Sequence, residues 1–355
     1  MSRAHACRRG CSILPPELLR RIALYGTRGQ REAALETLAV DNTLRLGRAT
    51  YELLESGAHR GLLGVPTAGK QRTVYNAQGH ETLPGRPMRA EGSAPVTDVE
   101  ANEAYDGLGA TFDFFADVYD RNSIDDEGLH LDATVHYGRR YDNAFWNGQQ
   151  MVFGDGDGDL FNRFTISLDV IAHELTHGVT GDEARLVYLG QAGALNESIS
   201  DVFGSLVKQY ARRQSVVNAD WLIGEGLFTS NVHGVALRSM KAPGSAFDDP
   251  VLGRDPQPAT MDGYVRTSAD NGGVHTNSGI PNHAFYLVAT TLGGYAWEKA
   301  GRIWYETLRD KRLKPTATFR QFARYTVLNA AHFFGTAERQ AVAAAWDEVG
   351  IRSAG

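Results

Sequence analysis

The string H-E-x-x-H formed by His173, Glu174 and His177 constrains the fold of this chain more than any other feature. Residues four apart lie on one face of an α-helix, so the two imidazoles can bind a single Zn²⁺ if this segment is helical. Glu174 can then reach a water molecule on the metal, which is hydrolytic chemistry. Such a pattern arises by chance in roughly one or two of a hundred chains of this length, so a third ligand is needed to support the hypothesis.

That third ligand is predicted in residues 194–211, whose apolar residues recur at helical spacing. Glu197 and Asp201 are four apart and share one face of this second helix. A carboxylate beside two histidines completes a His₂Glu set with an open fourth position, as a catalytic zinc needs. Asp201 is predicted to fix the tautomer and orientation of one histidine. The alternative is that Glu197 and Asp201 only form a solvated helix face.

Six motifs occur in the order found in one known family. They are N-A-F-W-N-G at 143–148, G-D-G-D-G at 154–158, H-E-L-T-H-G-V-T at 173–180, G-A-L-N-E-S-I-S-D at 193–201, L-R-S-M at 237–240 and D-N-G-G-V-H-x-N-S-G at 270–279. By these motifs the chain, from about residue 76 onward, resembles the thermolysin-like zinc metallopeptidases, and among them the protealysin-like group with a short propeptide. A metzincin is excluded, because Thr180 stands where that family requires glycine.

The expected fold class is α+β, with a β-rich N-terminal half and a mostly helical C-terminal half. The helix that carries His173 is expected between the two halves, at the floor of a cleft. The domains are predicted as a propeptide at 1–65, a β-rich catalytic domain at 66–182 and a helical catalytic domain at 183–355. The sequence patterns predict strands at 73–75, 135–141 and 151–153, and helices at 98–119, 194–212, 281–291, 296–309, 318–331 and 337–349.

The resemblance implies a catalytic role for individual residues. It makes His173, His177 and Glu197 the ligands of one catalytic zinc ion, and Glu174 the general base and acid. It also makes Tyr188 and His275, with His275 oriented by Asp270, the donors that stabilise the oxyanion of the tetrahedral intermediate. Preorganised donors of this kind are typically worth about 3 to 4 kcal/mol each. Without the motif, His275 would more often be a turn or surface residue, because it is a lone histidine in a glycine-rich loop.

Substrate binding is predicted from the same resemblance. Asn143 and Ala144 would lie on an edge strand that pairs with an extended peptide, and Arg238 would bind the substrate carbonyl beyond the scissile bond. Four apolar residues match the pocket for the residue after the cut: Phe161, Phe164, Val170 and Leu237. Cleavage is therefore expected before large hydrophobic residues. The alternative is that these four residues are ordinary core.

The N-terminal segment is predicted to be a separate unit. Helices are expected at 15–22, after a proline that suits the first turn, and at 30–48. Residues 58–72 form a predicted exposed linker and cleavage zone. The Pro-Pro-x-x-Leu string at 15–19 resembles the short propeptide of protealysin-like precursors, which would act as a chaperone and inhibitor. The alternative is a helical hairpin that stays attached.

Both cysteines of the chain, Cys7 and Cys11, lie in this segment, so the mature enzyme would have no disulfide. They could form a local bridge, stay free, or supply a thiolate to the zinc as a latency switch.

Calcium binding is expected to differ from that of the best-known family members. Asp169, Asp220 and Glu225 match their calcium ligands, but Lys208 and Leu222 replace two others. The resemblance therefore implies at most one calcium ion. The acidic run at 155–159 is predicted to be a hairpin turn, because it lacks the glycine and the final glutamate of an EF-hand loop.

Charge and hydropathy narrow the range of partners. A net charge of −6 argues against nucleic acid, and no apolar stretch is long enough for a membrane span. Expected partners are polypeptide substrates and the chain's own propeptide, with a dedicated protein inhibitor left open, and a monomer is expected. The basic N-terminus is not a conventional secretory signal. Secretion, implied by the resemblance, would use another route, and the alternative is cytoplasmic accumulation of the precursor.

Two other functions remain open at this point. One is an inactive zinc-binding protein of the same fold that serves only as a binding module, which would be expected to lack Glu174, Tyr188 or His275. The other is a zinc hydrolase acting on small amides, against which the peptide-binding edge strand at Asn143 argues.

Overall fold

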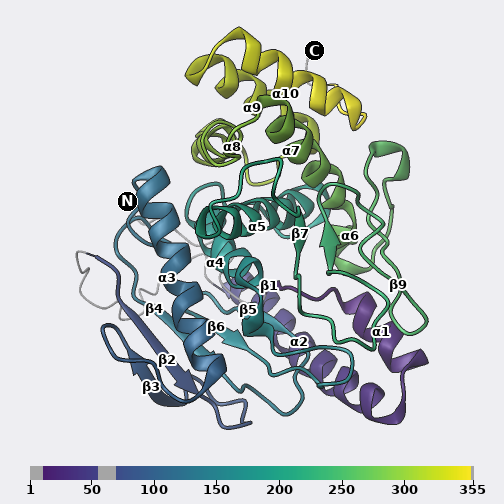
Figure 1. Cartoon of the computed structure of the whole chain (residues 1–355). Coiled ribbons are helices and arrows are strands. Elements are labelled where there is room, and N and C mark those ends of the chain that lie inside the picture. The colour runs from purple at the N-terminus through teal and green to yellow at the C-terminus, as the bar shows by residue number, and fades with distance from the viewer. Residues whose placement is uncertain (1–10, 55–68, 353–355) are drawn as a thin grey trace.

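A sheet-rich half and a helical half meet at two central helices, as Figure 1 shows. The computed structural model describes residues 11–54 and 69–352, with side chains left undescribed at 45–54. The central helices are α4, Leu168–Asp182, and α5, Gly190–Ala211, which pack closely on each other. A Cβ at Gly204 of α5 would lie 2.5 Å from the Asp169 carbonyl oxygen, so glycine is what permits this close approach.

Within the residues that the structure describes, a six-stranded sheet organises the N-terminal half, in the order β1-β5-β6-β4-β2-β3. The strands are β1 Cys11–Ser12, β2 Arg72–Asn76, β3 Arg86–Ala90, β4 Leu131–Val135, β5 Ala144–Trp146 and β6 Gln150–Phe153. The pairs β2–β4 and β4–β6 are parallel, and the other pairs are antiparallel. Helix α3, Val99–Tyr119, contacts β2, β4 and α4, and so packs on both the sheet and the helix that carries the H-E-x-x-H motif.

The strand predicted at 135–141 is wrong. The strand β4 ends at Val135, and the next residues turn, with φ of 55° at His136, 67° at Gly138 and 51° at Arg140. Tyr137 and Tyr141 are buried in a small aromatic cluster, which gave the segment its alternating pattern without strand geometry. The strands at 73–75 and 151–153 are confirmed by β2 and β6.

The C-terminal half is built from helices around an aromatic core. They are α6 Asp270–Asn277, α7 Gly279–Leu292, α8 Ala300–Arg309, α9 Phe319–Phe333 and α10 Thr336–Glu348. Trp304 of α8 stacks on Trp346 of α10 with ring centroids 6.0 Å apart. The predicted helices are confirmed, although the one predicted from residue 296 begins at Ala300.

Short strand pairs complete this half. The strands β7 Leu222–Ile223 and β8 Arg238–Ser239 pair, as do β9 Asp248–Asp249 and β10 Gly253–Arg254. Among the described residues, no helix is long and apolar enough to cross a membrane.

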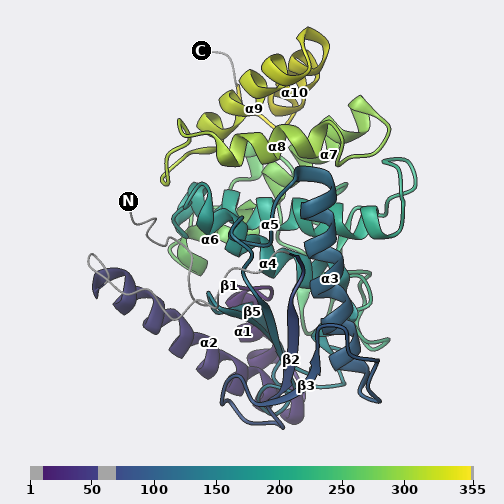
Figure 2. The ribbon, with the colours of Figure 1, turned by 90° about the vertical axis from the view of Figure 1, so that its left-hand side faces the viewer.

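The described part of the N-terminal segment, residues 11–54, forms two helices, as predicted. They are α1, Pro16–Tyr25, and α2, Arg28–Leu54. Both lie beside the β5 end of the large sheet, in purple in Figures 1 and 2. The short strand β1, which precedes α1, adds to the open edge of β5 with Cys11 opposite Trp146 and Ser12 opposite Phe145.

Candidate active site

The H-E-x-x-H residues lie on the face of α4 that meets α5. His173 and His177 are fully buried, and their Nε2 atoms are 3.1 Å apart. Glu197 of α5 lies opposite, with its two carboxylate oxygens each 3.5 Å from one of these nitrogens. The ligand atoms of the three residues lie within 4.8 Å of one another, so the structure brings the predicted zinc ligands together.

The outer nitrogens of both histidines are engaged by acceptors. His173 Nδ1 lies 2.8 Å from Asp201 Oδ1, and His177 Nδ1 lies 2.8 Å from Asn196 Oδ1. Ser200 Oγ is also 3.1 Å from His177 Nδ1. When Nδ1 of each ring carries the proton, Nε2 of that ring has a free lone pair that can bind a metal ion. Asn196 and Ser200 were not predicted, although both lie in the same sequence motif as Glu197.

These residues fit a divalent cation. Two imidazole lone pairs and a carboxylate converge within the protein, and Glu197 Oε2 has no hydrogen-bond partner among the described residues. Such a set of acceptors needs a positive charge at its centre, and two histidines with one carboxylate suit zinc. The same tendency appears in the pKa of His173, which burial would lower but which Asp201 and Glu197 raise to about 9.

Glu174, also on α4, faces the same space. Its Oε2 accepts a hydrogen bond from the Trp146 backbone N–H at 3.1 Å, which ties it to β5. Its Oε1 has no hydrogen-bond partner among the described residues. Burial raises the pKa of Glu174 well above its usual value, against the opposing charge of His173.

Asp201 connects His173 of α4 to Arg238 of β8. Besides His173, it accepts two hydrogen bonds from Arg238 of β8, at 2.8 and 2.9 Å, and one from Asn282 Nδ2 at 2.8 Å. Burial alone would raise its pKa, but Arg238 and His173 lower the pKa of Asp201 to about 2. Asp201 is therefore an anion that holds His173 and Arg238 in fixed positions. Asn282 was not predicted from the sequence.

His275, Asp270 and Tyr188 also come together at this site. Asp270 Oδ1 lies 2.8 Å from His275 Nδ1, and its Oδ2 accepts from the His275 backbone N–H at 2.9 Å. The intervening residues make this possible with a tight left-handed turn, in which Gly272 has φ of 89° and Gly273 of 75°. Tyr188 Oη is 3.3 Å from His275 Nε2 and donates a hydrogen bond to Glu197 Oε1. Burial opposes protonation, but Asp270 and Glu197 raise the pKa of His275 to about 9.

The N-terminal segment itself lies in the space between β5 and Arg238 of β8, which is called the groove from here on. The Ile13 N–H donates to the Ala144 carbonyl at 3.2 Å, and the Leu14 N–H donates to Asn143 Oδ1 at 3.0 Å. From the other side, Arg238 Nη1 donates to the Ile13 carbonyl at 3.1 Å. His275 Nε2 lies 3.0 Å from the Ser12 carbonyl oxygen. All the polar residues predicted to bind substrate therefore bind this strand.

The predicted apolar pocket is buried in the same core as this strand. Phe161, Phe164 and Val170 are fully buried, and Leu237 nearly so. Ile13 is fully buried and belongs to the same hydrophobic cluster. A cavity of 270 Å³ lies beside α1. It is lined by Leu18 and Arg21 of α1, by Pro15 just before that helix, and by Leu237, Arg238 and His275.

Cys11 is buried in β1, but it is not a member of the cluster formed by His173, His177 and Glu197. Cys7 lies outside the described residues. The arrangement therefore places a main-chain strand at the site, and the described part of the chain shows no thiol among the potential ligands.

Lys208 lies among the predicted calcium ligands. Its Nζ is 2.7 Å from Asp169 Oδ2, 2.8 Å from Asp220 Oδ1 and 2.8 Å from the Leu222 carbonyl oxygen. Glu225 pairs instead with Arg212 at 3.1 Å. An ammonium group thus already neutralises the two acids that the sequence suggested for calcium.

The acidic run at 155–159 is a loop and not the predicted hairpin turn. Asp157 Oδ1 accepts from the backbone N–H groups of Asp159, Leu160 and Phe161 at 2.8 to 3.0 Å, and the flanking strand β6 pairs elsewhere. Asp155 at its start lies 3.0 Å from His136, whose other nitrogen is 2.9 Å from Asp98, the cap of α3. Both ring nitrogens of His136 are thus engaged by carboxylates.

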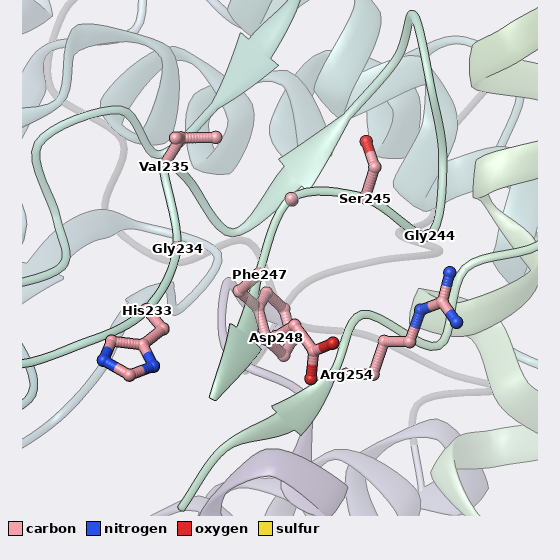
Figure 3. A pocket seen from close by; sticks show the side chains of 9 residues that line it. His233, Gly234, Val235, Gly244, Ser245, Phe247, Asp248 and Arg254 are labelled. Carbon is pink, nitrogen blue, oxygen red and sulfur yellow. The ribbon is translucent and has the colours of Figure 1, made fainter. Parts of the chain in front are cut away.

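A larger surface pocket adjoins the cavity beside α1, since Phe247 and Arg254 line both. It has a volume of 350 Å³, and Figure 3 shows His233 and Arg254 on opposite sides of it, with Phe247 and Asp248 between them. None of the predicted site residues lines it. The cluster on α4 and α5 therefore remains the candidate active site.

Comparison with known proteins identifies the family. Residues 42–181 match the thermolysin metallopeptidase catalytic domain, and residues 184–351 match the thermolysin metallopeptidase alpha-helical domain. The chain is 53% identical over 341 residues to an extracellular metalloprotease of Pectobacterium carotovorum subsp. carotovorum, covering 96% of both chains. It is 47% identical over 344 residues to protease PrtS of Photorhabdus sp. (strain Az29), covering 96% of this chain and 92% of the relative.

A solved structure agrees with these relatives. The precursor of protealysin, a metalloproteinase from Serratia proteamaculans, superposes with a TM-score of 0.87 at 54% identity, and the match covers 96% of this chain and 100% of the other. The predicted two-domain fold, with a sheet-containing N-terminal domain and a helical C-terminal domain, is thereby confirmed. The chain belongs to the thermolysin family of metallopeptidases.

Proposed function

We propose that this metalloendopeptidase is made as an inactive precursor and, once its leader is removed, cleaves polypeptides before large hydrophobic residues. Residues 1–65 are the leader in this proposal, followed by catalytic domains at 66–182 and 183–355. The single observation that carries it is the strand Cys11–Ser12 with Ile13 and Leu14, which binds in the groove beside the His173, His177 and Glu197 cluster as an extended peptide would.

The chemistry at the bond follows from the positions of four side chains. Zinc held by His173, His177 and Glu197 would activate a water molecule and polarise the substrate carbonyl. Glu174 then takes a proton from the attacking water and delivers it to the leaving nitrogen. Its position supports this role, because one oxygen is fixed by the Trp146 N–H and the other is buried without a hydrogen-bond partner among the described residues.

The oxyanion is stabilised by His275 and Tyr188. His275 Nε2 already donates to a peptide carbonyl, that of Ser12, at 3.0 Å, and Tyr188 Oη is 3.3 Å from the same nitrogen. Asp270 holds the ring with its Nε2–H directed into the groove. Removing one such donor typically lowers kcat by about 10²- to 10³-fold.

The register of the leader strand supports the specificity. The Ser12 carbonyl lies at the oxyanion donors, so the Ser12–Ile13 bond lies where a scissile bond would, and Ile13 takes the position just after the cut. Arg238 and Ala144 bind the backbone of Ile13, and Asn143 that of Leu14. A large apolar side chain at the position of Ile13 is therefore favoured by burial in the core that includes Phe161, Phe164, Val170 and Leu237.

Regulation follows from the same contacts. While the leader strand is in place, it covers β5 and excludes a substrate, so residues 1–65 act as the inhibitor and the cut that removes them falls in the region 58–72.

Lys208 takes the place of calcium beside Asp169 and Asp220, so activity does not depend on a calcium ion there. The enzyme acts outside the cell in this proposal, as the name of its Pectobacterium relative states for that protein.

The test of this function is a set of peptides that differ only at the residue after the cut. Phenylalanine, leucine and isoleucine at this position should give kcat/KM values at least about tenfold above those of serine or aspartate, because one large apolar side chain gains roughly 1.5 to 3 kcal/mol on burial. Equal cleavage of all five peptides by the mature enzyme would contradict the pocket assignment. A binding protein without hydrolytic activity would cleave none of them.

A further inference from the structure

The long leader helix α2 buries a carboxylate, Asp41, against the catalytic domain. Asp41 Oδ1 accepts from Tyr141 Oη at 2.6 Å, and its Oδ2 accepts from Asn143 Nδ2 at 2.8 Å. Asp41 is 2% exposed, and Tyr141 and Asn143 are equally buried. A carboxylate in such surroundings is stable only with strong donors, and these two donors come from the catalytic domain.

Asn143 links this carboxylate to the strand in the groove. Its Oδ1 accepts from the Leu14 N–H and from its neighbour Ala144 N–H, both at 3.0 Å, which uses both lone pairs of the oxygen. Its Nδ2 donates to Asp41. With the amide flipped, the NH₂ group would face two N–H donors and the oxygen would face a carboxylate. Asp41 therefore fixes the amide in the orientation that can hold Leu14.

We propose that Asp41 is the positioning residue through which α2 locks the leader strand in the groove. The inference rests on the function proposed above, in which that strand keeps the precursor inactive. Asp41 gives the leader a second contact with the side chain of Asn143. Asp41 is remote in sequence from Leu14, which contacts the same side chain. The two contacts are cooperative, because docking of Asp41 turns Asn143 Oδ1 toward Leu14.

Two further contacts on the same face of α2 support this docking. Thr37 Oγ1 accepts from the Asp142 N–H at 3.0 Å, and Gln30 Nε2 donates to Asp159 Oδ2 at 2.8 Å. Ala33 and Ala34 between them are fully buried. Asp41 is the charged member of this row, and charge-assisted hydrogen bonds are the stronger ones.

Asp41 leaves with the leader, so a substitution there changes the precursor and not the mature enzyme. The variants are Asp41→Asn, which keeps the shape, and Asp41→Ala, which removes both acceptors. Glu36→Gln is the matched control, because Glu36 lies on the exposed side of α2 and loses the same charge. All are made in full-length precursor that also carries Glu174→Ala, so that no self-cleavage interferes.

The readout is hydrogen exchange of the backbone amides of Ile13 and Leu14, which a merely local role of Asp41 in α2 would not change. We expect exchange at least about tenfold faster in Asp41→Asn, and faster still in Asp41→Ala, than in Glu36→Gln. With Glu174 restored, Asp41→Asn precursor should lose its leader faster, and the released enzyme should have unchanged kcat/KM.

Exchange at Ile13 and Leu14 that is the same in both Asp41 variants as in Glu36→Gln overturns the inference. This readout needs no catalysis. A mature enzyme that hydrolyses no peptide would therefore contradict the proposed function separately, while the exchange rates still decide the role of Asp41.

Discussion

Replacing the buried Lys208 by methionine tests how much its ion pairs with Asp169 and Asp220 stabilise the catalytic domain. Lys208 is 2% exposed, and its ammonium bonds Asp169 and Asp220 at 2.7 and 2.8 Å. Burial opposes its charge, but the two carboxylates raise the pKa of Lys208 above its ordinary value, so it is charged at neutral pH. Methionine keeps most of the side-chain volume and removes the charge. Asp169, which is fully buried, then loses its counter-ion.

The magnitude follows from this burial. Removing one partner of a buried ion pair typically costs about 3 to 5 kcal/mol, because the other charge is left uncompensated. An unfolding entropy of about 2.1 cal/mol/K per residue over 355 residues gives roughly 1.3 °C of Tm per kcal/mol. We therefore expect Lys208→Met to lower Tm by about 4 to 7 °C.

The assay is thermal unfolding of precursor that carries Glu174→Ala, which prevents self-digestion. Lys70→Met is the control, because the Lys70–Asp113 pair has side chains 25% and 50% exposed and should contribute about 1 kcal/mol or less. Millimolar Ca²⁺ should leave the Tm of the Lys208 protein unchanged, since the ammonium occupies the acidic group. Equal Tm values for the two methionine variants would refute this reasoning.

The remaining predictions concern catalysis and pH. His275→Ala should lower kcat by about 10²- to 10³-fold with unchanged zinc content, because it removes a donor to the oxyanion; steady-state kinetics and metal analysis check this, and a change in KM alone would contradict it. His136 should make stability fall at alkaline pH, since its bond to Asp155, against the effect of burial, raises the pKa of His136 from 6.5 to about 9. The folded pKa is the higher one, so this contribution is complete below pH 6.5 and is lost as pH rises through 9. For a partly exposed ring it should be about 1 to 2 kcal/mol. Urea unfolding of the Glu174→Ala precursor should show this loss. His136→Gln should reduce it by the His136 contribution, while the part due to His275, whose pKa is also raised to about 9, remains.

The set of candidate metal ligands could be predicted from the sequence, because helix geometry brings them together. Spacing of four residues puts His173 and His177 on one face, and the same spacing relates Glu197 to Asp201, which the structure places 2.8 Å from His173 Nδ1. These are local rules, and they hold whatever the rest of the chain does. The roles of Tyr188 and His275 came only from resemblance, because no local pattern brings residues so far apart in sequence to 3.3 Å.

Long-range pairing explains what the sequence could not show. Nothing in residues 11–14 indicates that they add to the edge of β5, since a two-residue strand has no periodicity of its own. The polar residues along one face of α2, which end at Asp41, can be interpreted only when the structure shows Asn143 opposite Asp41. The wrong strand at 135–141 has the same origin, because Tyr137 and Tyr141 are buried against Phe145 of β5 although their own segment is not a strand.

The central claim is that Glu174 performs hydrolysis at a zinc site that the leader blocks. The direct measurement is incubation of wild-type and Glu174→Ala precursor with casein, followed by intact-mass spectrometry of the chain and analysis of its zinc content. We predict that both proteins hold a single zinc ion, and that only the wild type loses its N-terminal segment and cleaves casein. A zinc-loaded wild type that stays intact and inert, or a Glu174→Ala protein that cleaves casein equally well, would contradict the account.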